Sequence, residues 1–373
     1  MASPLLVAAR VAADVARSGA DAAEAGRRLP EATVDTLARQ GMLTLCLPEA
    51  YGGPGADPLT FIEAIEIVAS GDGAAGWATM IGSTTSSMSA FLDAETAREI
   101  FPSSAARTSG VFAPNGAGVR DGDGYRVTGR WQWGSGSQSA SWIMGGARCD
   151  DGTQRSCFFP ASDVEFHDTW HTSGLRGTGS LDYSVDDAFV PERRTIEPGL
   201  ARPQVETPTT RFPNFTLLAI GIAAASIGIA RTALDELVAL AADKRPQFSS
   251  KTLAASGYAQ TELARAESNW RAARAYLHDE VGRAWATALA GDPVSVDARV
   301  GMRLAAAHAA TACAGVADAA FTIAGGSAVY DASLLGRCLR DAHVVTQHIM
   351  VAPKINETLG KHLMGVELDA RMI

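Results

Sequence analysis

The periodicity of apolar positions changes twice along the chain. Residues 1 to about 105 show helical spacing, for example at Leu5 and Leu37, which predicts helices. From about 106 to 205 apolar residues alternate with polar ones, and beyond 206 long helical patterns return. We therefore expect an α+β multidomain fold in three parts: an N-terminal α-helical domain over 1–105, an all-β domain over 106–205 and a helical bundle over 206–373.

The middle segment carries the clearest strand pattern. Tyr125, Val127, Trp131 and Trp133 alternate with polar residues, as in a strand with one buried face. DGDG at 121–124 is a strong turn signal just before this run,. The pattern predicts a domain built from short strands.

Four helical patterns follow, over 215–243, 252–290, 295–324 and 333–364. Each is near or above about 30 residues long, which exceeds the usual globular helix and implies a helical bundle. The first contains an apolar stretch that is interrupted by small and polar residues. It falls short of the roughly 20 residues that a membrane span needs, so we expect a buried helix and no membrane contact.

Composition narrows the function classes. The net charge of −9 and the pI near 5.3 disfavour a nucleic-acid partner, which needs clustered Lys and Arg. The five cysteines show no CxxC spacing and the N-terminus does not read as a signal peptide, which predicts a cytoplasmic protein. P-loop and Rossmann spacings are lacking, so neither type of nucleotide site is supported, and a nucleophile elbow is lacking as well,. No set of His, Cys and carboxylate residues has metal-ligand spacing, so we expect no metal.

The stretch WQWGSGSQSASW at 131–142 holds three tryptophans among small and hydroxyl residues. Its glycines would let the backbone approach a ligand closely, and Ser135 and Ser137 supply hydroxyl groups. Trp133 could lay its indole against a planar aromatic group. A β-turn with core tryptophans is the other interpretation, and this motif alone leaves both open.

Residues 324–350 form a second candidate. Gly325 and Gly326 end one helical pattern, and a charged one follows. Helical spacing sets Asp341 and His348 on one face and His343 on another. Because a histidine on a helix is often structural, the sequence leaves a structural and a catalytic role open.

Two further stretches carry weaker signals. ADKRPQFSSKTLA contains Arg245 and Phe248 in a cationic turn, which could hold a phosphate or simply complement the helix dipole. GDGAAGWATMIGSTTSSMSAF, which contains Trp77 and Thr84, reads as a helix rich in small and hydroxyl residues. Such a helix suits a pocket wall or a close contact between helices.

The chain resembles the acyl-CoA dehydrogenase fold superfamily, and more narrowly its two-component flavin-dependent monooxygenases, the group of the 4-hydroxyphenylacetate hydroxylase oxygenase components. Six segments in this order carry the resemblance: LPEAYGG, DGAAGW, GVFAPNG, GYRVTGRWQWGSGSQSASW, LDYSVDDAFVPERR and AGGSAVYDASLLGRCLRDAHVVTQH. It covers essentially the whole chain. It implies an N-terminal α-domain, a middle β-barrel and a C-terminal four-helix bundle, in a homotetramer with the flavin at the domain junction and the oligomer interface.

The catalytic base separates two branches of this superfamily. In the dehydrogenases a glutamate takes the substrate α-proton, and aligning Arg340 and Asp341 with their motif puts Ile349 at that position. The position used by some other members falls within 207–234, which contains no Asp or Glu. Without a base that proton cannot be removed at a useful rate, so the chain is similar to the monooxygenases.

In that group a separate NAD(P)H-flavin reductase supplies reduced FMN, less often FAD, which reacts with O2 to give a C4a-hydroperoxyflavin. This intermediate hydroxylates the substrate if water is excluded. The resemblance implies that Ser135 guards flavin N5 and that His348 acts as an acid or base. It implies cofactor contacts for a wider set: Phe112, Ala113, Asn115, Trp133, Ser135, Ser137, Arg245, Phe248, Gly325 and Gly326.

The resemblance implies an aromatic, phenolic or polycyclic small molecule as substrate, with Trp77, Thr84 and His343 in its pocket. A second histidine that some members carry near 80–90 is missing here, which leaves the substrate class open. Three alternatives remain: an N-oxygenase similar to the amino-sugar nitrososynthases, an FAD-dependent acyl-CoA dehydrogenase, and a non-catalytic protein of this fold.

Overall fold

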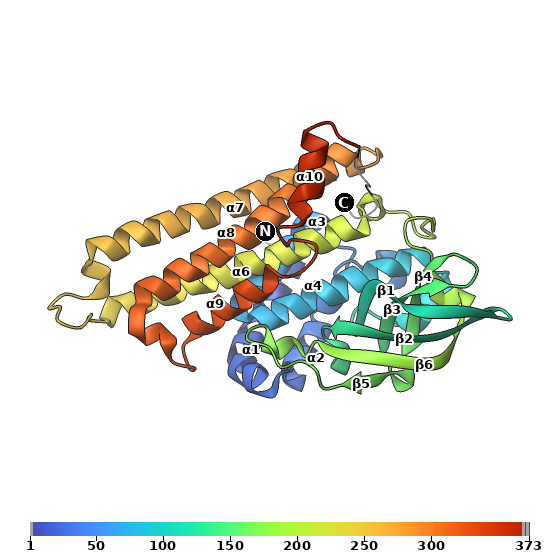
Figure 1. Ribbon diagram of the computed structural model, residues 1–373, viewed down its shortest axis with the longest axis horizontal. Helices are drawn as coiled ribbons and strands as arrows, with labels where there is room; N and C mark the ends of the chain where they lie inside the picture. Colours follow the sequence, from blue (N-terminus) through green and yellow to red (C-terminus); the bar gives the residue numbers. More distant parts are fainter. Residues whose placement is uncertain (1–2, 368–369, 371–372) are drawn as a thin grey trace.

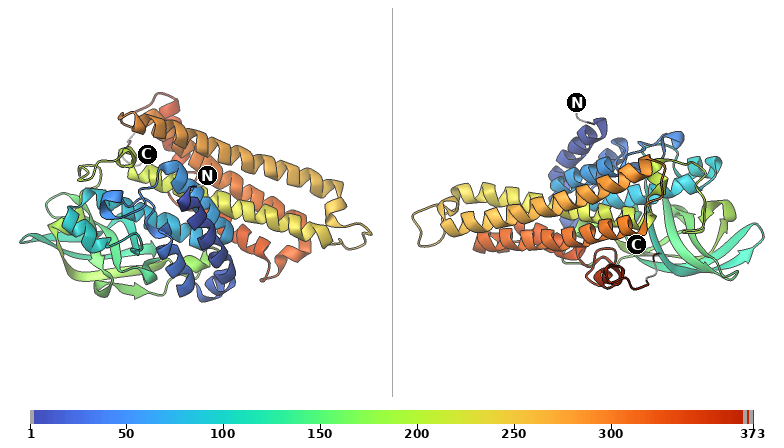
Figure 2. Two further views of the ribbon diagram at one scale, coloured as in Figure 1. Left: turned by 180° about the vertical axis from the view of Figure 1, so that it is seen from behind. Right: turned by 90° about the horizontal axis from the view of Figure 1, so that it is seen from above.

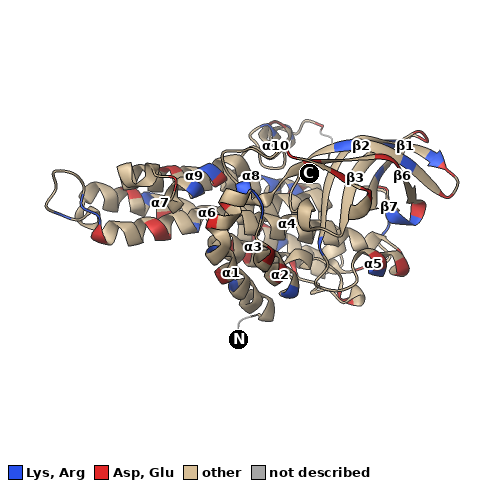
Figure 3. Cartoon of the chain, turned by 90° about the horizontal axis from the view of Figure 1, so that it is seen from below, with Lys and Arg blue, Asp and Glu red and all other residues tan. Residues whose placement is uncertain are grey.

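Long helices and a sheet occupy opposite ends of the molecule, and the first helices of the chain pack against both (Figure 1). The computed structural model describes residues 3–367, 370 and 373. Two further views show that the long helices extend to one side, away from the sheet (Figure 2). Lys and Arg positions are interspersed with Asp and Glu positions along the helices and strands (Figure 3).

Aspartates cap several of the N-terminal helices. These helices are α1 (Pro4–Gly26), α2 (Glu31–Arg39), α3 (Pro58–Gly71), α4 (Gly73–Ser87) and α5 (Ala94–Ile100). Asp57 accepts hydrogen bonds from two backbone N–H groups of α3 at 2.9 and 3.0 Å, and Asp72 accepts one from Ala75 of α4 at 3.0 Å. Such caps pair amides that have no partner inside the helix. Asp72 thereby fixes the start of α4, which carries Trp77.

Seven strands form one sheet in the order β5-β6-β2-β1-β3-β4-β7. They are β1 (Thr108–Asp121), β2 (Gly124–Gly134), β3 (Trp142–Cys149), β4 (Gln154–Pro160), β5 (Glu165–His167), β6 (Leu181–Pro191) and β7 (Thr195–Ile196). β1 and β3 are parallel, and the other neighbouring pairs are antiparallel. Trp131 is fully buried and stacks on Tyr183, with ring centroids 5.3 Å apart. Tyr125, Val127 and Trp131 are buried as the alternation predicts.

Helix α6 forms the centre of the C-terminal region. The helices here are α6 (Asn214–Asp243), α7 (Gly257–Leu289), α8 (Val296–Ala324), α9 (Leu334–Val345) and α10 (Ile355–Leu363). By composition α6 could cross a membrane, yet 89% of its most apolar window is buried inside the fold. A Cβ at Gly228 of α6 would lie 2.4 Å from the Glu66 carbonyl oxygen of α3, so the close approach of these helices needs glycine.

The prediction of one continuous helix over 333–364 is wrong, because two shorter helices occupy this stretch. The chain leaves the helical conformation after α9 and resumes it at α10, with turns between. Pro353 lacks the N–H that a helix interior uses and restricts the residue before it. Arg303 of α8, fully buried, donates to the Met350 carbonyl oxygen of this segment at 2.9 Å. His348 therefore lies in a turn, not on a helix face.

The predicted fold class is confirmed. Helices precede a middle sheet, and α6, α7, α8 and α9 pack as a helical bundle to one side of it. Helix α4 contacts both β1 and α6, so side chains from all three regions can meet around α4.

Candidate active site

Trp77, Ser135 and His348 come together from three separate parts of the chain. The indole N–H of Trp77 on α4 donates to Ser135 Oγ, in the turn after β2, at 3.0 Å. The Trp77 ring also meets the His348 ring edge to face, with centroids 5.6 Å apart. Trp77 and Ser135 are 6% and 5% exposed. Three residues singled out from sequence thus form one largely buried cluster.

A chain of hydroxyl groups continues from Ser135. Ser135 Oγ lies 2.6 Å from Ser180 Oγ, which lies 2.7 Å from Thr178 Oγ1. Thr178 Oγ1 donates to the Leu175 carbonyl oxygen at 2.8 Å. Sequence reasoning misses Ser180 and Thr178, and the available signal is the glycine- and hydroxyl-rich stretch LRGTGS ahead of β6.

Strand β1 loses its ladder partners beside this cluster. Residues 112–115 pair with neither β2 nor β3 among the described strands, because β1 shifts register there. Phe112, Ala113 and Asn115, all predicted cofactor residues, lie in this stretch. Pro114 in this stretch has no N–H, and its carbonyl oxygen already accepts from Arg148 at 2.9 Å. The other backbone N–H and C=O groups outside the ladder need partners, so the stretch suits contact with the polar edge of a ligand.

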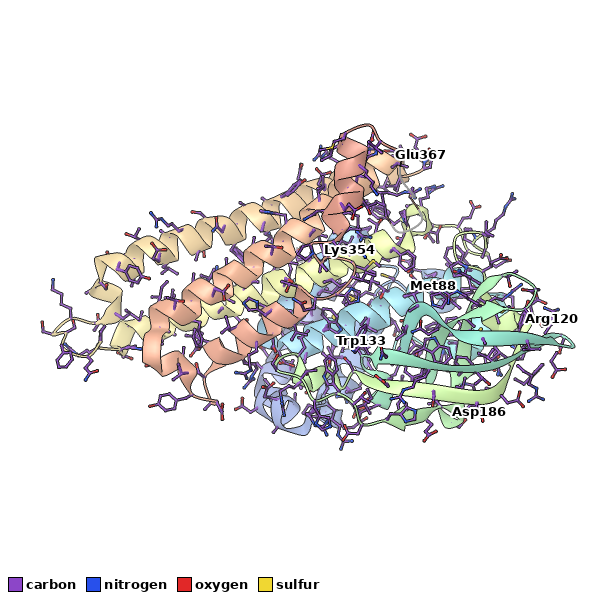
Figure 4. All side chains as sticks on the ribbon, in the orientation of Figure 1. Met88, Arg120, Trp133, Asp186, Lys354 and Glu367 are labelled. Carbon is purple, nitrogen blue, oxygen red and sulfur yellow. The ribbon has the colours of Figure 1, made fainter. Side chains whose placement is uncertain are left out.

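Trp133 has an unusual conformation for a bulky residue. Its φ is 66° and it is 68% exposed, at the end of β2 nearest the helices (Figure 4). The predicted alternation therefore fails at this residue, because β2 and β6 shift register between Trp131 and Gly134. A strained backbone that turns an aromatic side chain outward is characteristic of ligand sites.

Ser137 carries an unsatisfied polar group. Its Oγ is buried without a hydrogen-bond partner among the described residues, and such a group is costly until a ligand or water pairs with it. A cavity of about 30 Å³, lined in part by Thr108, Ser135 and Gly136, borders the same turn and has room for about one water,. The outward indole, the paired hydroxyls and the unladdered backbone together fit a flat ligand with polar edges, such as a flavin.

His348 is held as a neutral ring. Burial, together with the nearby Arg303 guanidinium, lowers the pKa of His348 to about 4. The Met350 backbone N–H donates to its Nδ1 at 3.2 Å. With Nδ1 accepting, the single proton of the neutral ring is on Nε2. In this state His348 can donate a hydrogen bond through Nε2 but cannot accept a proton there.

Comparison with known proteins identifies the family. The models "Acyl-CoA dehydrogenase, N-terminal domain" and "Acyl-CoA dehydrogenase, C-terminal domain" match residues 6–107 and 220–353. Indole-3-acetate monooxygenase of Pseudomonas putida is 34% identical over 345 residues, which is 91% of this chain and 88% of that protein. The oxygenase subunit HsaA of a flavin-dependent monooxygenase from Mycobacterium tuberculosis is 32% identical, over 96% of this chain and 94% of that protein. The chain belongs to the flavin-dependent monooxygenases of the acyl-CoA dehydrogenase family.

A solved structure agrees with this assignment. The 3-HSA hydroxylase from Rhodococcus sp. RHA1 superposes with a TM-score of 0.93 at 28% identity, and the match covers 100% of both chains. The alternative of an acyl-CoA dehydrogenase finds no catalytic base in this monooxygenase among the described residues of the cluster. Ile349, at the position of the dehydrogenase base, is apolar and 68% exposed, and the described contacts of Trp77, Ser135 and His348 include no carboxylate.

The remaining predicted cofactor residues lie at the far end of the bundle. Arg245 and Phe248 belong to the α6–α7 loop, which the ribbon shows at the end farthest from the sheet (Figure 1). Lys244 donates to the carbonyl oxygen of Ala324, so Gly325 lies at this end as well. The 30 residues of α6 separate this end from the sheet by about 45 Å. A single chain of the monooxygenase therefore does not bring the two groups together.

Thr84 and His343 make contacts outside the cluster. Thr84 is buried, and its hydroxyl donates to carbonyl oxygens of its own helix, one of them that of Met80 at 2.9 Å. His343 Nε2 lies 2.9 Å from Asp318 Oδ1 on α8, and both side chains are about half exposed. Among the described residues neither side chain has a hydrogen bond or ring contact to Trp77 or His348, and their place in a substrate pocket stays a prediction.

The buried carboxylate of Asp341 holds the loop that carries the hydroxyl chain. Asp341 Oδ1 of α9 accepts from the Leu175 backbone N–H at 2.6 Å. A Cβ at Gly174 would lie 2.3 Å from the Arg340 carbonyl oxygen, so this loop and α9 are in direct backbone contact. Burial raises the pKa of Asp341 to about 7, and nearby Asp72 adds to the rise. Asp341 thus joins α9 to the loop next to the site, and Asp72, which interacts with it electrostatically, caps α4.

Proposed function

We propose that this chain is the oxygenase component of a two-component system that hydroxylates an aromatic small molecule, using reduced flavin from a separate NAD(P)H-flavin reductase and O2. The observation that carries the proposal is the cluster of Trp77, Ser135 and neutral His348 beside the outward-facing Trp133. Bound reduced flavin would supply the oxygen-transfer chemistry. The protein's part is to bind the ring, exclude water and orient the substrate.

Each residue would have a distinct role in this function. Trp133 would cover one face of the flavin ring, and residues 112–115 would bind its polar edge through backbone groups. Ser135 would hold the proton at N5, whose loss leads to hydrogen peroxide. His348 would donate through Nε2 to the oxygen of a phenol or phenolate, an arrangement that stabilises developing negative charge.

The substrate class rests on relatives and on aromatic side chains. One relative is named as acting on indole-3-acetate and another as an FADH2-dependent resorcinol hydroxylase, and both of those compounds are aromatic. Trp77 and His348 offer an aromatic pair in the same cluster. We also propose a cytoplasmic location, where an NAD(P)H-flavin reductase can deliver FMNH2 or FADH2.

Oligomerisation would complete the site. Phe248 is fully exposed in one chain at a φ of 64°. The most apolar window within Val296–Val329, which comprises α8 and the 3-10 turn after it, is only 44% buried. We infer that a second copy covers these surfaces and that the α6–α7 loop of one copy reaches the flavin of another. The resemblance to the family makes a homotetramer the expected assembly.

A binding and turnover assay tests the proposal. Purified protein is titrated without oxygen with FMNH2 and with FADH2, because a structural neighbour, XiaF, is described with FADH2 and FMN remains our first expectation. Oxygen is then admitted with indole-3-acetate or resorcinol, and products are identified by mass. Hydroxylation that depends on added reduced flavin supports the function. Tightly bound FAD that acyl-CoA bleaches would contradict it in favour of a dehydrogenase.

A further inference from the structure

The hydroxyl chain beside Ser135 has fixed groups at both ends. At one end Trp77 contributes an indole N–H, which can only donate, to Ser135 Oγ at 3.0 Å,. At the other end the Leu175 carbonyl oxygen can only accept, and Thr178 Oγ1 lies 2.8 Å from it. Between them the Oγ of Ser180 lies 2.6 Å from Ser135 and 2.7 Å from Thr178. Every contact is within hydrogen-bond distance.

These two ends determine the direction of every bond between them. Thr178 has one hydroxyl proton and uses it on the carbonyl, so Ser180 must donate to Thr178. Ser180 has then used its own proton, so Ser135 must donate to Ser180. Reversing the whole chain would leave the Thr178 hydroxyl oxygen 2.8 Å from the Leu175 carbonyl oxygen without a proton between them. A reversal at one of the other two contacts would leave two hydroxyl oxygens in the same position at 2.6 or 2.7 Å. The chain therefore runs one way, from Trp77 to Leu175.

Burial keeps this direction from being disturbed by solvent. Ser135, Ser180 and Thr178 are 5%, 2% and 3% exposed. The terminal carbonyl is itself held in place, because the Leu175 backbone N–H donates to Asp341 at 2.6 Å. Aligned hydrogen bonds in such a setting also strengthen one another. Ser135 thus keeps no proton for a ligand and has one lone pair left.

We propose that Ser180 and Thr178 are positioning residues that hold Ser135 as a hydrogen-bond acceptor and so make the site select reduced over oxidised flavin. This inference rests on the proposed function. Reduced flavin carries a proton on N5 and can donate to Ser135. Oxidised flavin has only a lone pair on N5 and would face an oxygen that offers no proton. The selectivity would let the oxygenase take up reduced flavin from a reductase and release the oxidised form.

The test measures the dissociation constants of oxidised FMN and of FMNH2 without oxygen, so it does not depend on turnover. We expect wild type to bind FMNH2 more tightly. Ser180→Ala and Thr178→Val each free the Ser135 proton for oxidised N5. The ratio of the two constants should therefore fall by roughly two- to tenfold in either variant, the range expected for one neutral hydrogen bond. Thr178→Ser keeps the hydroxyl and should restore the wild-type ratio.

Two further variants serve as controls. Ser156→Ala removes another buried hydroxyl of the sheet, whose Oγ has no hydrogen-bond partner in the part of the chain that the structure describes, and should leave the ratio unchanged. Ser135→Ala removes the acceptor and should weaken FMNH2 binding. Circular dichroism confirms that each variant is folded.

The outcomes separate this inference from the proposed function. If wild type prefers FMNH2 while Ser180→Ala and Thr178→Val keep its ratio, the inference is overturned and the proposed function stands. An equal affinity of wild type for both redox forms also overturns it. Failure of wild type to bind either form, as FMN or as FAD, would count against the proposed function itself.

Discussion

Trp133 shows how a single residue can be kept in an unfavourable conformation. A bulky residue in the left-handed region costs on the order of 1–3 kcal/mol, and at 68% exposure this indole recovers little of that by burial. Trp131, two positions earlier, is fully buried in the sheet and stabilises it directly. The same residue type thus serves the core at one position and, we infer, the ligand at the other.

Replacement of Trp133 should separate binding from stability. Trp133→Gly relieves the backbone strain but gives a more flexible unfolded chain, so the free energy of unfolding should stay within about 1 kcal/mol of wild type. Reduced-flavin affinity should fall roughly tenfold with loss of the aromatic face. Trp133→Phe should keep most of the affinity. Anaerobic titration and chemical denaturation measure the two effects, and unchanged affinity in Trp133→Gly would contradict the role.

Ser135 should control what share of the consumed O2 is released as hydrogen peroxide. In Ser135→Ala the proton at N5 has no acceptor, so a larger share of consumed O2 should appear as hydrogen peroxide in place of product. The ratio of peroxide to hydroxylated product, compared with Ser156→Ala as control, gives the answer. A ratio equal to that of wild type would remove Ser135 from this role.

His348 should act as a neutral donor. His348→Ala should lower the rate of product formation by roughly 10²-fold or more, as for loss of an oriented donor or acid. With its pKa lowered to about 4, His348 stays neutral from pH 6 to 9, so its own titration should produce no change in rate over that range. His348→Asn keeps an N–H donor and should recover part of the activity. Near-normal turnover in His348→Ala would make the residue structural.

At the scale of elements, α9 and the loop before β6 act as one unit. Asp341 of α9 is fixed by the Leu175 N–H, and the same loop carries the two hydroxyls next to Ser135. Arg340 Nε also donates to the Ser173 carbonyl oxygen at 2.8 Å. Movement of α9 would therefore change the positions of the residues around Ser135.

The buried carboxylate of Asp341 should make stability depend on pH. Burial, with a contribution from Asp72, raises its pKa from 3.8 to about 7, so the folded state binds this proton more tightly than the unfolded state. The stability it contributes is present below about pH 4 and is lost as the pH rises through 7. Asp341→Asn keeps an acceptor for the Leu175 N–H without the charge. Its free energy of unfolding should therefore decrease less than that of wild type between pH 5 and 8.

Urea denaturation at several pH values tests this expectation. Asp331→Asn replaces an exposed carboxylate on the turn before α9 and should follow the wild-type pH dependence. If Asp341→Asn follows it as well, the carboxyl group does not stay protonated in the folded protein as described.

At the scale of the whole molecule, the predicted flavin residues fall into two separate groups. One lies around Trp77 of α4, whose first residue packs against Ile229 midway along α6, and the other lies in the α6–α7 loop at the far end of the bundle. Assembly of several copies would bring the α6–α7 loop of one chain to the Trp77 cluster of a neighbour. Phe248, fully exposed in one chain, contributes no burial to the stability of that chain. Its substitution should therefore affect flavin binding and not folding.

Mixed oligomers test the shared site. Phe248→Ala alone should weaken reduced-flavin binding roughly tenfold, and His348→Ala alone should abolish most activity. When the two variants are unfolded together and reassembled, some sites combine an intact His348 with an intact Phe248 from another copy. Activity of the mixture should then exceed the mean of the separate variants. An activity equal to that mean would contradict a site shared between copies.

The sequence by itself determined the order of elements, the buried face of β2 and the family, because apolar periodicity and local motifs depend on neighbouring residues. It also singled out Trp77, Ser135 and His348 separately. It did not place His348 in a turn. Pro353 disfavours a continuous helix, but the bond from Arg303 of α8 to the Met350 carbonyl oxygen of this segment is known only from the tertiary structure.

Only the tertiary structure decided which of the candidate residues meet and what state they are in. Ser180 and Thr178 have no motif of their own, and their importance comes from hydrogen bonds to Ser135 and Leu175. The neutral state of His348 likewise arises from burial and from Arg303, which is far from it in the sequence and near it in space. Directions of hydrogen bonds and pKa values depend on neighbours in space, and a linear sequence does not specify those neighbours.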